Sequence, residues 1–393
     1  MKRIVLWVGG IGLALALGLG GFIALYGVQT LFNPGPQRAA LKAADAGLRV
    51  VTVARGLEHP WSLAFLPGGR MLVTERAGRL RIVGADGWLS PPLTGVPDVA
   101  AKGQGGLMDV ALAPDFSATR RIYFAYAEAD AENPKHAGTV VAHARLGVSG
   151  LEDVTVIFRQ TPKAKGWGHF GARLVFADDG TLFITLGERF HHKAQAQNLE
   201  NSLGKIIRVT AAGAAPADNP FIDKPGALPE IYSYGHRNVQ GAALHPLSRR
   251  LWVHEHGARG GDELNIIDPG HNYGWPVITW GRDYSGLPIG EGTHKPGMGQ
   301  PIHYWTPSIA PSGMAFVTAD RYPGWRGSLI IGSLAHKRLV RLSLDGERVV
   351  GEEHLLAEMG ERIRDVRQGP DGLIYLLTDS ATGRILRLEP RED

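Results

Sequence analysis

One pattern recurs six times between residue 47 and the end of the chain. Each copy is a short strand with a small or apolar centre, a turn rich in Pro, Asp or Gly, and a second β-rich strand. The copies are SLAFLPGGRMLVTER, DVALAPDFSATRRIYFAYA, RLVFADDGTLFITLG, GAALHPLSRRLWVHE, GMAFVTADRYPGWRGSLIIG and RDVRQGPDGLIYLLTD. Their strand centres are Ala64, Ala111, Val175, Ala243, Ala315 and Arg367, at intervals of 47, 64, 68, 72 and 52 residues. Six units of irregular length predict an all-β fold, a six-bladed β-propeller.

The two ends of this region carry strands that lie outside the six copies. LRVVTVA (residues 48–54) precedes the first copy, and RILRLEP (residues 384–390) ends the last. Pairing them in one blade would close the ring and remove an exposed sheet edge. A pair of β-sandwiches is the alternative, but it does not explain six similar units.

The composition narrows the chemistry. The chain has no cysteine, which excludes disulfides, thiolate zinc sites and a cysteine nucleophile, so any metal must bind to oxygen or imidazole ligands. The formal net charge of +4 is too small and too dispersed to indicate nucleic-acid binding. The 53 glycines and 25 prolines predict many turns, as in an all-β chain.

The N-terminus predicts a membrane segment. Lys2 and Arg3 precede an uncharged apolar run of 23 residues, Ile4 to Tyr26, which is long enough to cross a bilayer core of about 30 Å as a helix. Positive charges before the run predict a cytoplasmic N-terminus. Residues 1–26 are therefore expected to be a signal anchor, with a cleaved signal peptide as the alternative. Residues 27–46 are predicted to be a linker and residues 47–393 to be the propeller. The propeller would lie in the periplasm, anchored to the inner membrane.

Polar side chains precede several predicted inner strands by a similar number of residues. In a propeller these positions meet at one mouth of the central channel. They are His169, six before Val175; Arg237, six before Ala243, with Asn238 next; Gln104, seven before Ala111; His59, five before Ala64; and Arg362 and Arg364, five and three before Arg367.

These residue types suggest a ligand site. Arg237, Arg362 and Arg364 would favour a polyanionic or quinonoid ligand, because guanidinium groups pair well with carboxylates. His169 beside them is a candidate general base. Any one of these residues alone would be interpreted as a rim or structural residue. Because they precede different inner strands by a similar number of residues, a shared phase, they favour a ligand-binding site.

Other stretches leave alternatives open. HEHGARGGDELN (residues 254–265) is rich in glycine and oxygen donors, so it fits either a Ca²⁺ loop or an ordinary turn that ends at an N-cap, Asp262. Trp305 is either a face on which a sugar stacks or a core aromatic. No G-x-S-x-G, H-E-x-x-H, P-loop or dinucleotide motif is present.

Several segments together resemble the soluble sugar dehydrogenases that depend on pyrroloquinoline quinone (PQQ), the glucose/sorbosone and aldose sugar dehydrogenases. The resemblance runs from about residue 48 to 390. It rests on PWSLAFLPGGRMLVTERAGRLRIV, GQGGLMDVALAPDF, GHFGARLVF, YGHRNVQGAALHP, GGDELNIIDPGHNYGWP and RIRDV.

The resemblance implies a propeller that holds PQQ and Ca²⁺ at the channel mouth and oxidises an aldose at C1 to its lactone. The electrons then leave to an acceptor other than oxygen, whose identity the sequence does not indicate. The implied roles are a catalytic base, His169; the neighbours of the quinone oxygens, Arg237 and Asn238; the partners of the cofactor carboxylates, Arg362 and Arg364; a residue near the sugar, Gln104; and the Ca²⁺-binding carbonyls, Gly257 and Ala258.

The sequence departs from the family pattern at two places. The family usually has a lysine directly after GSL, where this chain has Ala335, and Lys337 follows two positions later as a possible substitute in cofactor binding. Some members have an acid just before the catalytic histidine, where this chain has Gly168. The alternative function is a non-redox propeller, such as a Ca²⁺-dependent lactonase or a sugar-binding module, which the arginine-rich mouth disfavours.

Overall fold

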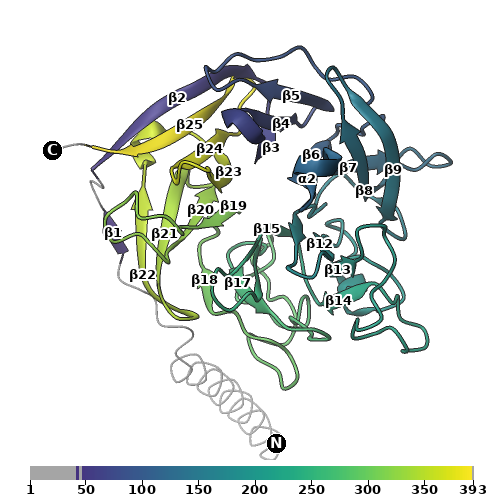
Figure 1. The fold of residues 1–393 in the computed structure, drawn as a ribbon. Helices are drawn as coiled ribbons and strands as arrows, with labels where there is room; N and C mark the ends of the chain where they lie inside the picture. Colours follow the sequence, from purple (N-terminus) through teal and green to yellow (C-terminus); the bar gives the residue numbers. More distant parts are fainter. Residues whose placement is uncertain (1–40, 44–46, 392–393) are drawn as a thin grey trace, which may run out of the picture. The chain divides into compact units, whose positions relative to one another are not determined.

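The computed structural model describes residues 41–43 and 47–391, and these residues form six small sheets arranged in a ring (Figure 1). The prediction of an all-β six-bladed propeller is confirmed. From the inner strand outward, the first sheet consists of β3 (Pro60–Phe65), β4 (Met71–Glu75) and β5 (Arg79–Val83). The second consists of β6 (Leu107–Leu112), β7 (Arg121–Ala129) and β8 (His136–Leu146), and both β9 (Leu151–Arg159) and β10 (Ala164–Lys165) pair with β8. The third consists of β11 (Leu174–Phe176), β12 (Leu182–Thr185), β13 (Lys205–Val209) and β14 (Ile231–Tyr234).

The remaining sheets follow the same order. The fourth consists of β15 (Val239–Leu244), β16 (Leu251–Glu255), β17 (Asp262–Ile267) and β18 (His303–Trp305). The fifth consists of β19 (Pro311–Phe316), β20 (Leu329–Ser333), β21 (Arg338–Asp345), β22 (Arg348–Leu355) and β1 (Leu41–Ala43). The sixth consists of β23 (Ile363–Gln368), β24 (Ile374–Thr378), β25 (Gly383–Pro390) and β2 (Leu48–Leu57). The helical turns in the described residues are α2 (Phe116–Thr119), η1 (Pro67–Gly69), η2 (Lys193–Gln197) and η3 (Ala357–Met359).

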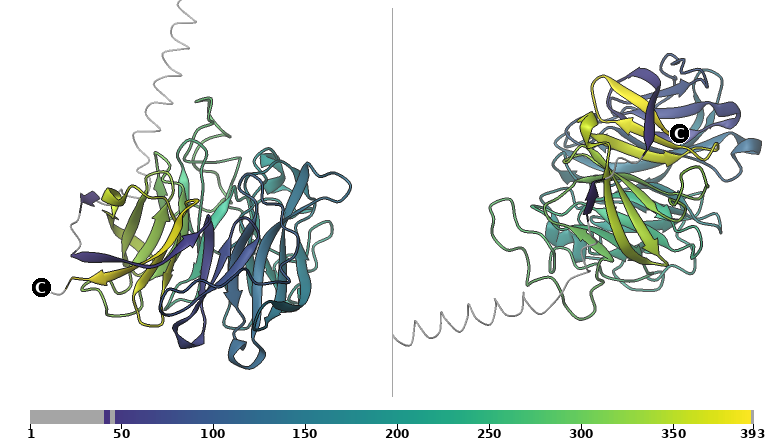
Figure 2. Two further views of the ribbon diagram at one scale, coloured as in Figure 1. Left: turned by 90° about the horizontal axis from the view of Figure 1, so that it is seen from above. Right: turned by 90° about the vertical axis from the view of Figure 1, so that its left-hand side faces the viewer.

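Each predicted strand centre lies in the first strand of a sheet. These six strands contact one another in ring order, from β3 through β6, β11, β15, β19 and β23 back to β3, so they surround the central channel. The ring closes as predicted, because β2 pairs antiparallel with β25 from Leu48 opposite Pro390 to Leu57 opposite Gly383 (Figure 2). The N-terminal strand of the ring therefore completes the last blade.

The blades are held together by apolar packing between neighbouring sheets. Every residue of β4, β13, β16, β20 and β24 is buried, because the second and third strands of a blade face another blade on both sides. One core cluster joins Leu63 of the first sheet, Ile330 of the fifth and Leu376 of the sixth. At roughly 1.5–3 kcal/mol for each large side chain removed from water, this packing is the main favourable contribution to folding.

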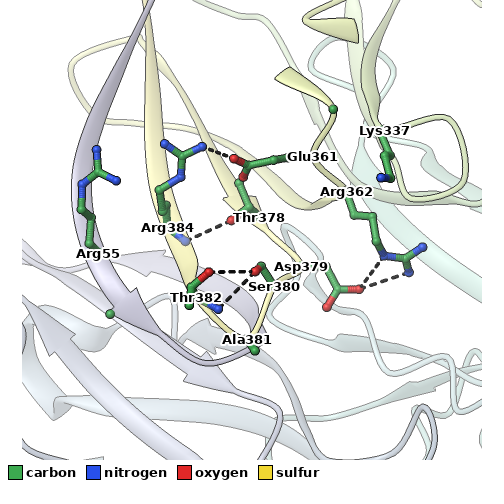
Figure 3. Close-up of a pocket in the computed structure, with 12 residues that line it drawn as sticks. Arg55, Lys337, Glu361, Arg362, Thr378, Asp379, Ser380, Ala381, Thr382 and Arg384 are labelled. Carbon is green, nitrogen blue, oxygen red and sulfur yellow. Dashed lines mark hydrogen bonds and ion pairs between the residues drawn. The ribbon is translucent and has the colours of Figure 1, made fainter. Parts of the chain in front are cut away.

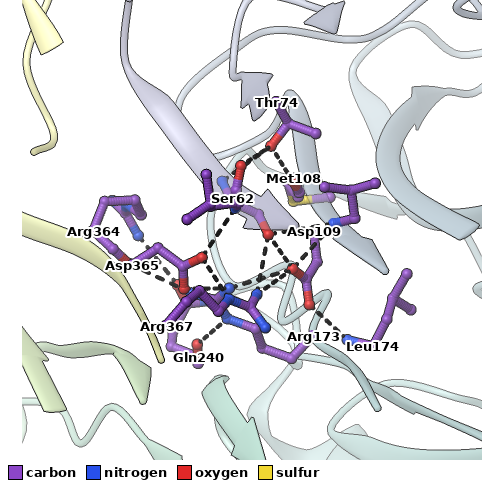
Figure 4. Close-up of polar contacts among 12 residues, drawn as sticks. Ser62, Thr74, Met108, Asp109, Arg173, Leu174, Gln240, Arg364, Asp365 and Arg367 are labelled. Atoms are coloured by element: carbon purple, nitrogen blue, oxygen red, sulfur yellow. Dashed lines mark hydrogen bonds and ion pairs between the residues drawn. The ribbon is translucent and has the colours of Figure 1, made fainter. Parts of the chain in front are cut away.

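Four charged side chains lie at the centre of the ring; three are buried, and the fourth, Arg367, is 28% exposed (Figure 4). The Arg367 Nη2 donates to the Asp109 carboxylate at 2.8 Å, and its Nε donates to Asp365 at 2.8 Å. The Arg173 Nη1 lies 2.9 Å from Asp365 Oδ1 and 3.4 Å from Asp109 Oδ1. Ser62 donates its hydroxyl to Asp109. These four charged residues, the channel quartet, have a formal sum of zero.

The channel quartet reaches every blade. Asp109 also accepts the Leu174 N–H at 2.8 Å, Asp365 accepts the Leu63 N–H at 3.2 Å, and Arg173 donates its Nε to the Gln240 carbonyl at 2.8 Å. On β19 a Cβ at Gly313 would lie 2.2 Å from Asp365 Oδ1, so only glycine fits there. Because the charges are paired and hydrogen-bonded, their burial is tolerated.

The predictions for the N-terminus are only partly covered by the structure. The predicted anchor, residues 1–26, lies outside the described residues, and within the described part no helix is both long and apolar enough to cross a bilayer. The predicted linker, residues 27–46, needs one correction: Leu41–Ala43 form β1, which pairs in parallel with β22 opposite Glu352 to His354. The unpaired outer edge of that blade offers backbone hydrogen bonds that a linker strand can use.

We predict that Asp109→Asn lowers the free energy of unfolding by about 3–5 kcal/mol, because it leaves the buried Arg173 and the partly buried Arg367 with one carboxylate fewer. Urea denaturation followed by tryptophan fluorescence measures this change. The matched control is Asp345→Asn, which removes an exposed partner of Arg348 and should change the value by less than about 0.5 kcal/mol. Equal unfolding midpoints for the two variants would contradict the stabilising role of the channel quartet.

Candidate active site

A cavity of about 240 Å³, the mouth pocket, opens above the channel quartet. Four residues predicted from sequence line it together: Gln104, Asn238, Arg362 and Arg364. Gln104, Asn238 and Arg362 lie in loops before three different inner strands, and Arg364 lies near the start of the third, β23. Its lining also includes Trp61, Gln240 and His256, which sequence reasoning did not single out.

His169 lies in the wall next to this pocket. Its backbone adopts φ 50°, in the left-handed region, and its N–H donates to Gln104 Oε1 at 2.8 Å. The side chain is only 3% exposed, and its Nδ1 lies 2.9 Å from Glu188 Oε1. Phe190 packs edge-on against the imidazole at 5.0 Å between ring centroids. A carboxylate on Nδ1 fixes the tautomer with its proton there and leaves Nε2 as the basic nitrogen.

The electrostatic surroundings keep this imidazole neutral. Burial and the nearby Arg237 and Arg189 guanidinium groups lower the pKa of His169 well below its usual value. Burial also raises the pKa of Glu188 to about 7, although Arg237 and His192 oppose that shift. Above that pH a neutral imidazole faces an ionised carboxylate, which is the arrangement of an oriented general base.

Glu188 was missed because only the residues before each inner strand were considered. The second strand of a blade runs antiparallel to the first, so the residues that follow it return to the same mouth. Glu188 follows β12 in this way, His256 follows β16 and Asp379 follows β24. A polar residue shortly after each second strand is therefore the signal that would have found them.

Arg237 is held beside His169 by the end of β16. Its backbone N–H donates to Glu255, and its Nη1 donates to the His256 carbonyl at 3.0 Å and to the Gly257 carbonyl. Its guanidinium lies 5.2 Å from the Trp275 ring centroid. The Nε is buried and has no hydrogen-bond partner in the described part of the protein. The positive charge is thus fixed in position but incompletely satisfied.

The candidate calcium loop, which contains Gly257 and Ala258, lies just after β16. Asp262 shapes it by accepting the N–H groups of Gly257, Ile309 and Ala310 at 2.8–2.9 Å. Burial raises the pKa of Asp262 to about 6, although these hydrogen bonds oppose the shift. Ala258 is 8% exposed and lines a neighbouring cavity. Within the described residues no cluster of three or more His, Cys, Asp or Glu side chains could hold a metal, so any cation here must bind backbone carbonyls.

Arg362 and Arg364 share one carboxylate. Asp379 Oδ2 accepts from Arg364 Nη2 at 3.0 Å and from Arg362 at 3.2 Å, and its Oδ1 lies 3.0 Å from His59 Nδ1. Burial opposes the charge of Asp379, but Arg364, His59 and Arg362 together hold its pKa well below its usual range. Burial also lowers the pKa of Arg364, so its charge is poorly solvated. One carboxylate serves two arginines, and the mouth pocket keeps an excess of positive charge.

Two predicted residues lie elsewhere. Lys337 does not line the mouth pocket but an adjacent cavity, which it shares with Arg362. Trp305 is 5% exposed, in β18, and packs in a core cluster with Trp252 and Leu329, so the prediction that it contacts a sugar is corrected in favour of the core alternative. It is buried because β18 is the outer strand against which the next blade packs.

Comparison with known proteins identifies the family. The model for the family described as glucose/sorbosone dehydrogenase matches residues 57–387. The chain belongs to the glucose/sorbosone dehydrogenase family. By this membership it is an oxidoreductase of the sugar dehydrogenase type, as the sequence resemblance implied.

Individual relatives agree with this membership. The aldose sugar dehydrogenase YliI of Escherichia coli (strain K12) is 49% identical over 358 residues, 90% of this chain and 96% of the relative. A crystal structure of the soluble aldose sugar dehydrogenase from Escherichia coli in the apo form is similar with a TM-score of 0.85, at 48% identity, covering 88% of this chain and 100% of that one. The PQQ-bound aldose sugar dehydrogenase from Streptomyces coelicolor is similar with a TM-score of 0.72, at 31% identity, with the same coverage.

We predict that the His169 imidazole stays neutral at a pH where an ordinary histidine is already protonated, because burial and the nearby guanidinium groups hold its pKa well below the usual value of about 6.5. The unfolded chain takes up that proton first, so this group lowers folding stability as the pH drops below about 6.5. Histidine side-chain NMR measures the protonation state, and the His169→Asn variant assigns the signal by its loss. A signal that titrates near the unperturbed value would contradict this.

Proposed function

We propose that this protein oxidises aldose sugars at C1 to lactones, using PQQ and Ca²⁺ at the channel mouth and passing the electrons to an acceptor other than oxygen. The observation that carries the proposal is a buried neutral imidazole, His169, oriented by Glu188 next to a pocket lined by Arg362 and Arg364. Family membership gives the same reaction class.

The mouth pocket fits a flat quinone that carries carboxylates. Arg362 and Arg364 line it with one shared acidic partner, so both can also bind ligand carboxylates. The buried Arg237 Nε lacks a partner within the described residues, and Asn238 adds a carboxamide to the lining. The Trp61 ring offers an apolar face in the same pocket. A neutral sugar alone would leave this positive charge uncompensated.

The loop at Gly257 and Ala258 fits a hard cation. The backbone carbonyl oxygens there are donors of the type that Ca²⁺ prefers. Asp262 holds the loop through the Gly257 N–H, and the Gly257 carbonyl accepts a hydrogen bond from Arg237. When bound, PQQ supplies the acceptor for the hydride that leaves C1, and Ca²⁺ polarises the quinone as a Lewis acid.

The residues of the chain then have separate tasks. His169 Nε2 accepts the proton of the C1 hydroxyl, which raises the tendency of C1 to release hydride. Glu188 holds the Nδ1 proton and stabilises the imidazolium that forms. Gln104 orients the backbone of His169 and lines the mouth pocket, where it could contact a sugar. Arg237 would add a fixed positive charge next to a bound quinone.

The alternative, a Ca²⁺-dependent lactonase, has less support. Such a site would need carboxylate ligands around its metal, and the described residues contain no such cluster. The predicted periplasmic location and membrane anchor depend on residues outside the described part of the chain and remain predictions.

We predict that apo-protein mixed with PQQ and Ca²⁺ reduces a redox dye when an aldose is added, and that His169→Ala lowers kcat by about 10²–10⁴-fold while PQQ binding is retained. Dye absorbance with several aldoses measures turnover. The matched control is His271→Ala, an exposed histidine that should keep full activity. Absence of dye reduction with every sugar at saturating PQQ would overturn the proposed function, and full activity of His169→Ala would overturn the role of the base.

A further inference from the structure

A second cavity, the side pocket, lies over the last blade next to the mouth pocket (Figure 3). It has a volume of about 610 Å³. Its walls come from the ends of β2, β24 and β25 and from the loops before β21 and β23. The family resemblance names two of its lining residues, Arg362 and Lys337, as cofactor partners, but it assigns no ligand to the rest of the lining.

The side pocket carries more positive than negative charge. Four cations line it, Arg55, Lys337, Arg362 and Arg384, against two acids, Glu361 and Asp379. Arg384 pairs with Glu361, and Arg362 pairs with Asp379. Arg55 and Lys337 have no ion-pair partner among the described residues, and both are exposed. Their charges are therefore available to a ligand.

Hydroxyl groups line the floor between these cations. Ser380 and Thr382 lie 3.2 Å apart through their hydroxyl oxygens, and the Thr382 N–H donates to Ser380 Oγ at 3.1 Å (Figure 3). The Thr378 hydroxyl accepts the Arg384 N–H at 3.0 Å. Such groups both donate and accept hydrogen bonds, so they suit a ligand that itself carries hydroxyls.

The side pocket is separated from the mouth pocket by Asp379. This carboxylate holds Arg364 and His59, and only Arg362 lines both cavities. Arg55 and Arg384 lie on the far side, in the strands that close the ring. A molecule held by Arg55 and Arg384 would therefore leave Arg364 available to the mouth pocket.

We propose that the side pocket binds a small hydroxylated organic anion, a sugar acid or a sugar phosphate. The cations recognise the carboxylate or phosphate, and the serine and threonine hydroxyls recognise the polyol. One member of this class is the aldonate formed when a lactone hydrolyses, and that link alone rests on the proposed function. The binding itself requires no turnover.

Isothermal titration of the full chain tests this proposal with four probes: gluconate, glucose 6-phosphate, inorganic phosphate and glucose. At least one of the two organic anions should bind, more tightly than inorganic phosphate, and glucose should not bind at this site. A preference for gluconate or for glucose 6-phosphate tells whether the natural ligand carries a carboxylate or a phosphate. The organic anion that binds should still bind after saturation with PQQ and Ca²⁺.

Variants locate the binding. Arg55→Ala and Arg384→Ala should each weaken the binding of the organic anion about tenfold or more, which corresponds to about 1.4 kcal/mol. Arg55 has no ion pair among the described residues, so its removal does not endanger folding. The matched control is Arg348→Ala, an exposed arginine paired with Asp345, which should leave the affinity unchanged.

Four results would overturn the proposal: no binding of either organic anion, equal affinity for inorganic phosphate, unchanged affinity in both variants, or complete displacement by PQQ. The last result would mean that the anions occupy the mouth pocket. If PQQ itself fails to bind, the proposed function fails, but the anion titration and the two variants still test the side pocket.

Discussion

The rest of the structure depends on a pair of carboxylates and a pair of guanidinium groups that neutralise one another inside the channel. Each charge of the channel quartet alone would be too costly to bury, but together they connect the inner strands of separate blades. The quartet also supports the pocket above it: the Arg173 guanidinium lies 4.2 Å from the Trp61 ring centroid and donates to the Arg364 carbonyl. The apolar packing between blades forms the ring, and the quartet fixes what lies at its centre.

The mouth above this floor has the opposite electrostatic character, because its cations are not matched. Arg237 has an unpartnered Nε within the described residues, and Arg362 and Arg364 share Asp379. This excess charge is unfavourable in the empty pocket and favours an anionic ligand. Burial, together with the charges of Arg237 and Arg189, lowers the pKa of His169 and keeps its imidazole unprotonated. Under the proposed function Arg237 would therefore help to keep the base neutral, while Arg362 and Arg364 would bind the cofactor carboxylates.

Much of this arrangement could be predicted from the sequence. The strand–turn–strand copies located all six inner strands, and counting back from their centres found Gln104, Asn238, Arg362 and Arg364, which meet in one pocket. Glu188 and Asp379 escaped this count because they follow second strands, which reach the same mouth from the other direction. The sequence could not decide between the sugar-stacking and core alternatives for Trp305, because a propeller buries both faces of its strands and an aromatic side chain near the mouth can still belong to the core. The pairing of Asp109 with Arg173 and Arg367 joins residues up to 258 positions apart and has no local signal.

The central claim is that the mouth pocket holds PQQ with the help of Ca²⁺. An absorbance titration of the apo-protein with PQQ, with and without Ca²⁺, tests it most directly, because the spectrum of a quinone changes when it enters a buried and charged site. The account predicts a saturable spectral change at about one PQQ per chain, with higher affinity when Ca²⁺ is present. A spectrum identical to that of free PQQ at every protein concentration, with or without Ca²⁺, would contradict it.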